Sequence, residues 1–212
     1  ICDIISLSGL PLAAPSANTS GRPSPTTARH VINDLDGKID AVVIGKDCSV
    51  GVESTVVSLV GDKPRLLRPG AVTPEQLRTV LPDLVIDSAV LKQLKNGEKA
   101  ASPGMKYKHY APKTEAYLVE GCSNSFVKFV NAKADCAAVC FDEEYYNIST
   151  PKISYGSKYD ETTLAKNVFS VLRDVDSLGV KEIYIHAPSK NGVGLAVYNR
   201  LIRACAFRVI TL

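Results

Sequence analysis

Small hydroxyl side chains gather in a proline-rich stretch near the start of the chain, at residues 9–26. Proline fixes a backbone torsion and lacks an amide donor, so the prolines of this stretch exclude a helix or a central strand. The apolar lead-in at residues 10–14 predicts a short strand that ends in a stiff loop. Such a loop suits a phosphate or a small polar substrate, although spacing alone equally allows an ordinary connection. The hydroxyls belong to Ser16, Thr19, Ser20 and Ser24.

A second candidate for chemistry is the basic segment at residues 92–113, which carries six lysines and a single acid, Glu98. A Ser-Pro-Gly sequence interrupts it, as is typical of a connector between domains. Residues 105–110 interleave cations with aromatic rings. In a functional interpretation, a tyrosine there stacks on a base and a lysine approaches a phosphate. The residues by themselves favour a solvated linker, because charge runs usually face solvent.

The composition is that of an ordinary globular protein, with 45% hydrophobic and 22% charged residues in a chain of 212. This length suits one large domain or two small ones. A net charge of +3 is too small to indicate nucleic-acid binding by itself. No apolar run approaches the length of a membrane span, and no signal segment opens the chain. Because it begins at Ile1, we expect a piece of a longer protein.

The six cysteines show neither paired zinc-type spacing nor a Cys-x-x-Cys redox motif. Several lie in apolar runs, such as residues 137–141, and are interpreted as small buried hydrophobes. A reducing cytoplasm is the expected compartment. The three histidines, His30, His109 and His186, are far apart in sequence and form no metal motif, so no metal site is predicted.

Apolar spacing and capping residues predict the elements that must position these groups in the first half of the chain. One helix begins after Thr26 or Thr27 and ends at Gly37. A second begins at Thr73, with proline at its first position. Short apolar runs bounded by turn residues predict buried strands. These runs are residues 41–44, 56–60 and 65–68.

Beyond residue 113 strands and helices alternate, which indicates a small, mostly parallel, Rossmann-like α/β domain. No Gly-x-Gly-x-x-Gly fingerprint follows its first strand, so a dinucleotide site is not predicted. The expected strands are residues 116–119, 137–141, 182–186 and 207–212, and the expected helices are residues 123–132, 162–178 and 195–205. The predicted domains are residues 1–88 and 114–212, joined by a linker at 89–113.

Several ordered motifs resemble one known family. Residues 15–26 (PSANTSGRPSPT) resemble the signature loop of the YrdC-type domain, and residues 51–57 (GVESTVV) and 67–70 (LRPG) follow in the order that this domain shows. Residues 102–112 (SPGMKYKHYAP) resemble the inter-domain linker of the two-domain threonylcarbamoyl-AMP synthases. Residues 196–201 (AVYNRL) resemble the last helix of their C-terminal domain. Together these motifs span nearly the whole chain.

The resemblance implies an α/β fold in which a partial YrdC-like domain is joined by a basic linker to a small Rossmann-like domain. It implies an L-threonylcarbamoyladenylate synthase, a cytoplasmic nucleotidyltransferase that forms threonylcarbamoyl-AMP and pyrophosphate from L-threonine, bicarbonate and ATP for N6-threonylcarbamoyladenosine in tRNA. Magnesium is expected with ATP, because it neutralises charge on the leaving pyrophosphate. The product passes to a separate tRNA threonylcarbamoyl transferase complex, so neither a membrane nor stable nucleic-acid binding is required.

The resemblance also assigns ATP contacts, residue by residue. Ser16 and Ser24 are expected to contact ATP. Arg68 is expected to clamp a phosphate, a role that suits the rigid guanidinium fork. A linker tyrosine, either Tyr107 or Tyr110, is expected to close over the nucleotide. The resemblance leaves the choice between the two tyrosines open.

For threonine, the resemblance assigns Ala14 through its backbone and Ser54 through its backbone or hydroxyl. Asn18 and Thr55 are weaker candidates that orient the loops. Glu53 is either an aid to proton or metal chemistry or a buried structural carboxylate. We name no general base, because catalysis is expected to rest on positioning the reactants and stabilising developing charge.

The departure from the family pattern is large, because the usual N-terminal half of the YrdC-type domain is absent from the sequence. We therefore expect half of a site, a chain that is inactive alone, and exposed apolar surface. Two other functions stay open. One is an RNA-binding YrdC-like protein with a basic face extended by the linker, and the other is a non-catalytic regulatory fragment.

Overall fold

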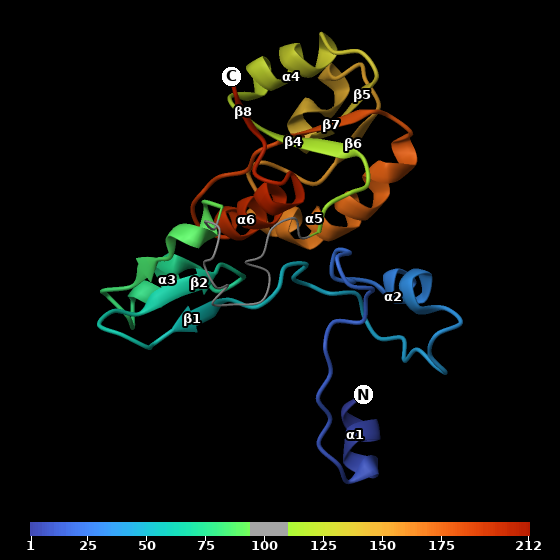
Figure 1. Cartoon of the computed structure of the whole chain (residues 1–212), viewed down its shortest axis with the longest axis vertical. Coiled ribbons are helices and arrows are strands. Elements are labelled where there is room, and N and C mark those ends of the chain that lie inside the picture. Colours follow the sequence, from blue (N-terminus) through green and yellow to red (C-terminus); the bar gives the residue numbers. More distant parts are fainter. Residues whose placement is uncertain (94–109) are drawn as a thin grey trace.

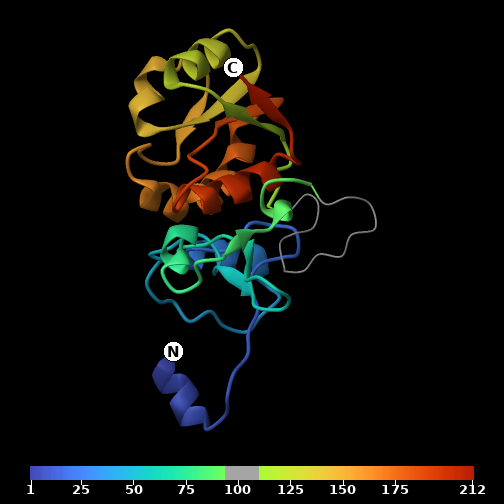
Figure 2. The ribbon, with the colours of Figure 1, turned by 90° about the vertical axis from the view of Figure 1, so that its left-hand side faces the viewer.

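The computed structural model describes residues 1–93 and 110–212. Within these residues the helices are α1 (Cys2–Ser8), α2 (Ala28–Leu35), α3 (Pro74–Arg78), α4 (Ser123–Asn131), α5 (Glu161–Asp174) and α6 (Gly194–Ala204), with 3₁₀ turns η1 (Ser88–Val90), η2 (Asp142–Asn147) and η3 (Val175–Leu178). The strands are β1 (Val56–Ser58), β2 (Arg65–Arg68), β3 (Val85–Ile86), β4 (Glu115–Glu120), β5 (Cys136–Cys140), β6 (Lys152–Ser154), β7 (Glu182–His186) and β8 (Val209–Thr211). They form two separate sheets, and α5 and α6 lie between them (Figures 1 and 2).

The larger sheet has the strand order β6-β5-β7-β4-β8, and all its neighbouring strands are parallel. The predicted Rossmann-like arrangement is thereby confirmed. All residues of β5 are buried, as expected for a parallel sheet covered on both faces. Strand β6 is not predicted from the sequence, because this short strand at the edge of the sheet has the sequence Lys-Ile-Ser and carries no apolar run.

Alternating side chains of the strands supply two apolar cores, one on each face of this sheet. Leu118 packs in the cluster that contains Phe169 of α5, whereas its neighbour Val119 packs in the cluster that contains Phe126 of α4. Successive side chains of a strand point to opposite faces, which explains the division. The helices predicted from apolar spacing are therefore the ones that cover the sheet.

The smaller sheet pairs β1 with β2 in antiparallel and β2 with β3 in parallel orientation. The predicted helix start at Thr73 is confirmed, because Thr73 and Gln76 form a reciprocal capping box at the start of α3. Leu66 and Leu84 of this half pack in one cluster with Leu195 of α6. Helix α6 is consequently buried along its whole length, since it contacts both halves of the chain.

Helix α2 lies where the sequence predicts it, with Thr27 as the N-cap and Gly37 in the left-handed conformation just after its end. Its Asp34 fastens it to α5. The fully buried carboxylate accepts hydrogen bonds from Arg22 at 2.7 Å and from the two terminal nitrogens of Arg173 at 3.0 and 2.9 Å. Hydrogen bonding to Arg173 outweighs the cost of burial and lowers the pKa of Asp34 to about 2.

Two predicted strands are wrong. Residues 10–14 and 41–44 have no regular structure, and the side chains of Val43 and Ile44 are 61% and 70% exposed. A strand requires a hydrogen-bonded neighbour, and nothing in residues 1–93 or 110–212 pairs with either segment. An apolar run alone does not supply that neighbour.

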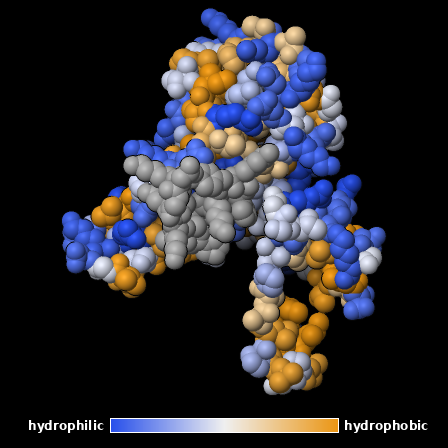
Figure 3. Space-filling model, in the orientation of Figure 1, coloured by the Kyte–Doolittle hydropathy of each residue, from blue (hydrophilic) through white to orange (hydrophobic). Residues whose placement is uncertain are grey.

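The apolar surface expected from the sequence is present at the start of the chain. Helix α1 projects away from the other elements and buries none of its side chains (Figure 1). Ile4 is 50% and Leu7 88% exposed, and this region forms an orange patch in Figure 3. Across residues 1–93 and 110–212, no helix combines the length and apolarity that a membrane crossing requires.

Candidate functional site

The carboxylate of Glu53 connects segments that lie far apart in the sequence. Ser24 Oγ donates a hydrogen bond to Glu53 Oε1 at 3.1 Å. Arg200 Nε of α6 donates to Glu53 Oε2 at 2.6 Å. The hydroxyl of Tyr110, near the C-terminal end of the linker, also donates to this carboxylate. We call these four side chains the Glu53 network.

The network has a defined charge state at neutral pH. Burial disfavours ionisation of Glu53, but the charge of Arg200 and the hydrogen bonds from Tyr110 and Arg200 keep its pKa below the ordinary value. Burial, and then the negative charge of Glu53, raises the pKa of Tyr110. Glu53 is therefore an anion and Tyr110 a neutral donor. Hydrogen bonds to an ionised acceptor are the stronger kind.

Arg68 on β2 lies beside this network. Its Nε donates to the backbone carbonyl of Ser54 at 2.9 Å, which ties the residue after Glu53 to the strand. Burial, followed by the charge of Arg200, lowers the pKa of Arg68, yet a guanidinium stays protonated in a protein. Two cations thus flank one carboxylate, an arrangement that can accept a further anion.

Two glycines let the backbone pack tightly around Glu53. A Cβ added to Gly70 would lie 2.5 Å from the Thr55 nitrogen and 2.6 Å from the Glu53 oxygen. A Cβ added to Gly51 would lie 2.3 Å from the Ala165 oxygen of α5. The segment that carries Glu53 is therefore held between the small sheet on one side and α5 on the other.

Asn18 and Thr55, the two weaker candidates, each donate side-chain hydrogen bonds to backbone carbonyls. The Asn18 side-chain amide donates to the carbonyls of Thr19 and Arg22 at 3.0 and 3.2 Å. The Thr55 hydroxyl donates to the carbonyl of Val72 at 2.7 Å. The Asn18 contacts close a local loop, whereas the Thr55 contact ties residue 55 to the segment that follows β2. The role of these residues toward a substrate stays a prediction.

The remaining predicted site residues are less well connected. Ala14 and Ser16 lie exposed on the segment that precedes Ser24 and, within the described part of the chain, neither side chain bonds to the Glu53 network. Tyr107 falls outside the described residues. Tyr110 is 2% exposed, and its ring lies 5.0 Å from that of Phe169.

Sequence reasoning missed Arg200 as a partner of the site. The sequence does carry one indication: Arg200 directly precedes Leu201, an inward-facing residue of a helix that is predicted to be amphipathic. A charge in that position needs a buried partner of opposite sign. The sequence cannot name that partner, because Glu53 lies 147 residues away.

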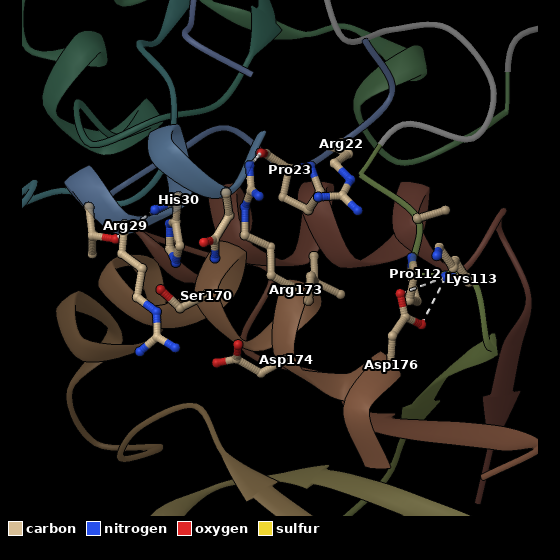
Figure 4. Close-up of a pocket in the computed structure, with 14 residues that line it drawn as sticks. Arg22, Pro23, Arg29, His30, Pro112, Lys113, Ser170, Arg173, Asp174 and Asp176 are labelled. Atoms are coloured by element: carbon tan, nitrogen blue, oxygen red, sulfur yellow. Dashed lines mark hydrogen bonds between the residues drawn. The ribbon is translucent and has the colours of Figure 1, made fainter. Parts of the chain in front are cut away.

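A cavity of about 580 Å³ lies between α2 and α5 (Figure 4). Arg173 reaches upward from α5 to the carbonyl of Pro23, while Asp176 accepts hydrogen bonds from the backbone of Lys113. The lining includes Arg22, Arg29 and His30 but none of the Glu53 network. Burial, and then the charge of Arg173, lowers the pKa of His30, whereas the nearby carboxylates of Asp174, Asp34 and Asp47 act in the opposite direction.

Two protein-family models match the chain. Residues 72–206 match the family described as threonylcarbamoyl-AMP synthase, C-terminal domain. Residues 2–70 match the family named for Sua5, YciO and YrdC and described as telomere recombination. The chain belongs to the threonylcarbamoyl-AMP synthase family. The resemblance noted from the motifs is thereby confirmed.

Relatives named threonylcarbamoyl-AMP synthase match along nearly the whole chain. The protein from Pyrococcus abyssi is 40% identical over 217 residues, which cover 98% of this chain and 61% of that protein. The protein from Bacillus subtilis is also 40% identical, over 98% of this chain and 60% of its own length. The chain thus spans about 60% of the length of these curated relatives.

A solved member of the threonylcarbamoyl-AMP synthase family shares the fold. The crystal structure of P. abyssi Sua5 complexed with L-threonine has a TM-score of 0.80 and 36% identity, covering 99% of this chain and 62% of that chain. A doubly substituted variant of the same protein has a TM-score of 0.82 and 36% identity, covering 99% and 61%. The mixed α/β architecture expected from the sequence is confirmed.

Proposed function

We propose that this chain contributes to an L-threonylcarbamoyladenylate synthase, a nucleotidyltransferase that forms threonylcarbamoyl-AMP and pyrophosphate from L-threonine, bicarbonate and ATP. The supporting observation is the Glu53 network, which joins the Ser24 loop, the Glu53–Ser54 segment and Tyr110. These are the segments that the family resemblance assigns to the substrates. Relatives carrying this name, and a related structure complexed with L-threonine, support the same assignment.

We assign ATP to Ser16, Ser24 and Arg68, together with Tyr107 or Tyr110. The Arg68 guanidinium keeps donors beyond the one that Ser54 uses, and these suit phosphate oxygens. A fixed cation beside a phosphate stabilises charge that develops there without reorganisation during the reaction. Arg68 accordingly stabilises the developing charge and does not transfer a proton.

We assign L-threonine to Ala14 and Ser54. Ser54 follows Glu53 directly, and its backbone carbonyl accepts the hydrogen bond from Arg68. A threonine bound at Ser54 is therefore adjacent to the guanidinium that we assign to the phosphates. The reaction joins three molecules, and holding them in one geometry removes much of the entropic barrier. Asn18 and Thr55 hold the loops that supply this geometry.

We propose that Mg²⁺ enters with the phosphates of ATP. Among residues 1–93 and 110–212, no cluster of three or more His, Cys, Asp or Glu side chains could hold a metal ion. Magnesium commonly binds through substrate phosphates with few protein ligands, so the described residues fit this mode better than a dedicated metal site. In that mode the ion neutralises charge on the leaving pyrophosphate.

We further propose a cytoplasmic protein whose product passes to a tRNA threonylcarbamoyl transferase complex. Direct tRNA binding by this chain is not needed for that transfer. The proposed division is residues 1–88 for the later half of the catalytic domain, 89–113 for the linker and 114–212 for the C-terminal domain. The small sheet and the parallel sheet fall in the first and last of these ranges.

Pyrophosphate release tests the proposed function. In the full-length protein we expect ATP-dependent release that falls to background when either L-threonine or bicarbonate is omitted. Release that continues without both would contradict the synthase. Salt-sensitive RNA binding without pyrophosphate release would instead favour the RNA-binding alternative.

Substitution of the linker tyrosines tests the nucleotide contact. Stacking on a base is worth about 1–3 kcal/mol, so Tyr107→Ala should raise the apparent KM for ATP about tenfold. Tyr110→Ala should raise it as well, because it removes a buried ring that packs on Phe169 and bonds to Glu53. Tyr110→Phe keeps the ring on Phe169 and removes the hydroxyl that bonds to Glu53, so it should have a smaller effect. Tyr146→Ala is the control, because Tyr146 is 93% exposed. An unchanged KM in both alanine variants would mean that the linker is only a tether.

A further inference from the structure

Arg200 is a buried cation that spans the two halves of the chain. Its side chain is 1% exposed, and its Nε lies 2.6 Å from Glu53 Oε2. Its opposite edge donates to Asn199 Oδ1 at 2.8 Å. Asn199 in turn donates to the carbonyl of Val90, beside the small sheet, at 2.6 Å. The guanidinium is therefore fixed from both sides.

Glu53 links Arg200 to two further side chains. The same carboxylate accepts the hydroxyl of Ser24 and the hydroxyl of Tyr110. A buried carboxylate that loses its cation must take up a proton or move toward solvent. Either change weakens the acceptor that holds Ser24 and Tyr110 in place. Arg200 itself need not touch a substrate for its loss to disturb both.

The Arg200–Glu53 ion pair is not the sole contact between the two halves. Leu195 packs with Leu66 and Leu84, and Arg203 donates to the carbonyl of Ala89 at 2.7 Å. A buried ion pair contributes little net stability compared with apolar side chains of similar volume. If Arg200 only held the two halves together, an apolar side chain in its place would serve as well as a cation paired with Glu53.

We propose that Arg200, from the C-terminal half, is a positioning residue for the ATP and threonine site and acts through the Glu53 carboxylate. The proposal rests on the proposed function. It gives the C-terminal half a specific task, which is to set the geometry of Ser24 and Tyr110. Loss of Arg200 should therefore impair substrate handling, in addition to the stability that is lost when the Glu53 carboxylate is left without its counter-ion.

Steady-state kinetics of the full-length protein provide the first test. Arg200→Met should lower kcat/KM for ATP about thirtyfold, and Arg200→Lys, which keeps the charge but not the fork, should restore part of it. The control is Arg208→Met, because Arg208 also pairs with a glutamate, Glu115, but at the surface and within the C-terminal half. Equal effects of R200M and R208M, or no gain in R200K over R200M, would overturn the proposal.

A double-mutant cycle with Glu53→Gln decides whether Arg200 acts through that carboxylate. R200M/E53Q should be no worse than the more impaired single variant, whereas R208M and E53Q should combine within about twofold of additivity. Additive losses for R200M and E53Q would overturn the proposal. If R200M does not fold, the cycle is run with R200K and the same criteria.

Hydrogen exchange separates this proposal from the proposed function. The amides of residues 51–56 should exchange at least about tenfold faster in R200M than in the parent protein, and R208M should leave them unchanged. This outcome would support the Arg200–Glu53 link even if the parent protein released no pyrophosphate. Unchanged exchange at these amides in R200M would overturn the positioning role.

Discussion

Gly70→Ala is expected to lower the free energy of unfolding by about 3 kcal/mol and to abolish pyrophosphate release by the full-length protein. The new Cβ would lie 2.5 Å from the Thr55 nitrogen and 2.8 Å from the Ser54 carbonyl carbon. These are backbone atoms, so no rotamer change relieves the overlap. The segment that carries Glu53 and Ser54 must shift, and the site geometry shifts with it.

The same substitution at Gly45 is the control for Gly70→Ala. A Cβ there meets no atom within 4 Å, and the backbone torsion is an ordinary one. Urea denaturation of both variants gives the difference in unfolding free energy. A loss in Gly70→Ala no larger than that in Gly45→Ala would show that the Glu53 segment is not tightly packed against Gly70.

Asp34→Asn is expected to cost about 3–5 kcal/mol of stability at pH 7, because it leaves Arg173 buried without its counter-ion. The Asp34 side chain is fully buried, and that of Arg173 is 10% exposed. Asp135→Asn is the matched control, since Asp135 pairs with Lys181 at the surface with both side chains largely exposed. Such pairs contribute less than about 1 kcal/mol. Equal losses in the two variants would contradict the buried role of Asp34.

The pH dependence of stability provides an independent check on Asp34. Its pKa is about 2 in the folded chain, below the ordinary value of 3.8. A lowered carboxyl pKa contributes stability that is present above the unfolded value and is lost as pH falls through the folded value. Between pH 5 and pH 2, the difference in unfolding free energy between the parent protein and Asp34→Asn should therefore fall by about 2 kcal/mol. Denaturation curves measured across this range give that difference. A difference that stays constant with pH would show that the pKa of Asp34 is not lowered in the folded chain.

The C-terminal half could be predicted from the sequence because a covered parallel sheet leaves strong local signals. Strand β5 at residues 136–140 is apolar and buried throughout, and helices α4 and α5 each bury one regular face. Each strand also has a hydrogen-bonded neighbour, so the apolar pattern and the paired structure agree. The exception is β6, which contributes an edge strand with no apolar run.

The first half was harder to predict because its structure depends on distant partners. The apolar run at 41–44 has the composition of a strand but no neighbour among the described residues. The motifs assign Ser24 and Ser54 to one site, and in the structure Ser24 bonds to Glu53, the residue that directly precedes Ser54. The roles of both serines toward substrates stay a prediction. Spacing could not reveal Arg200, since a tertiary ion pair leaves no periodic trace in the sequence.

The order of synthesis gives the contacts of Asp34 and Glu53 a further consequence. Asp34 precedes Arg173 by 139 residues, and Glu53 precedes Arg200 by 147. At about 5–20 residues per second, a ribosome needs roughly 7–30 s to make the intervening chain. Both carboxylates therefore leave the ribosome well before the arginines that will bury them. The first half of the chain can adopt its final form only when α6 has been made, so premature termination within that helix damages both halves of the chain.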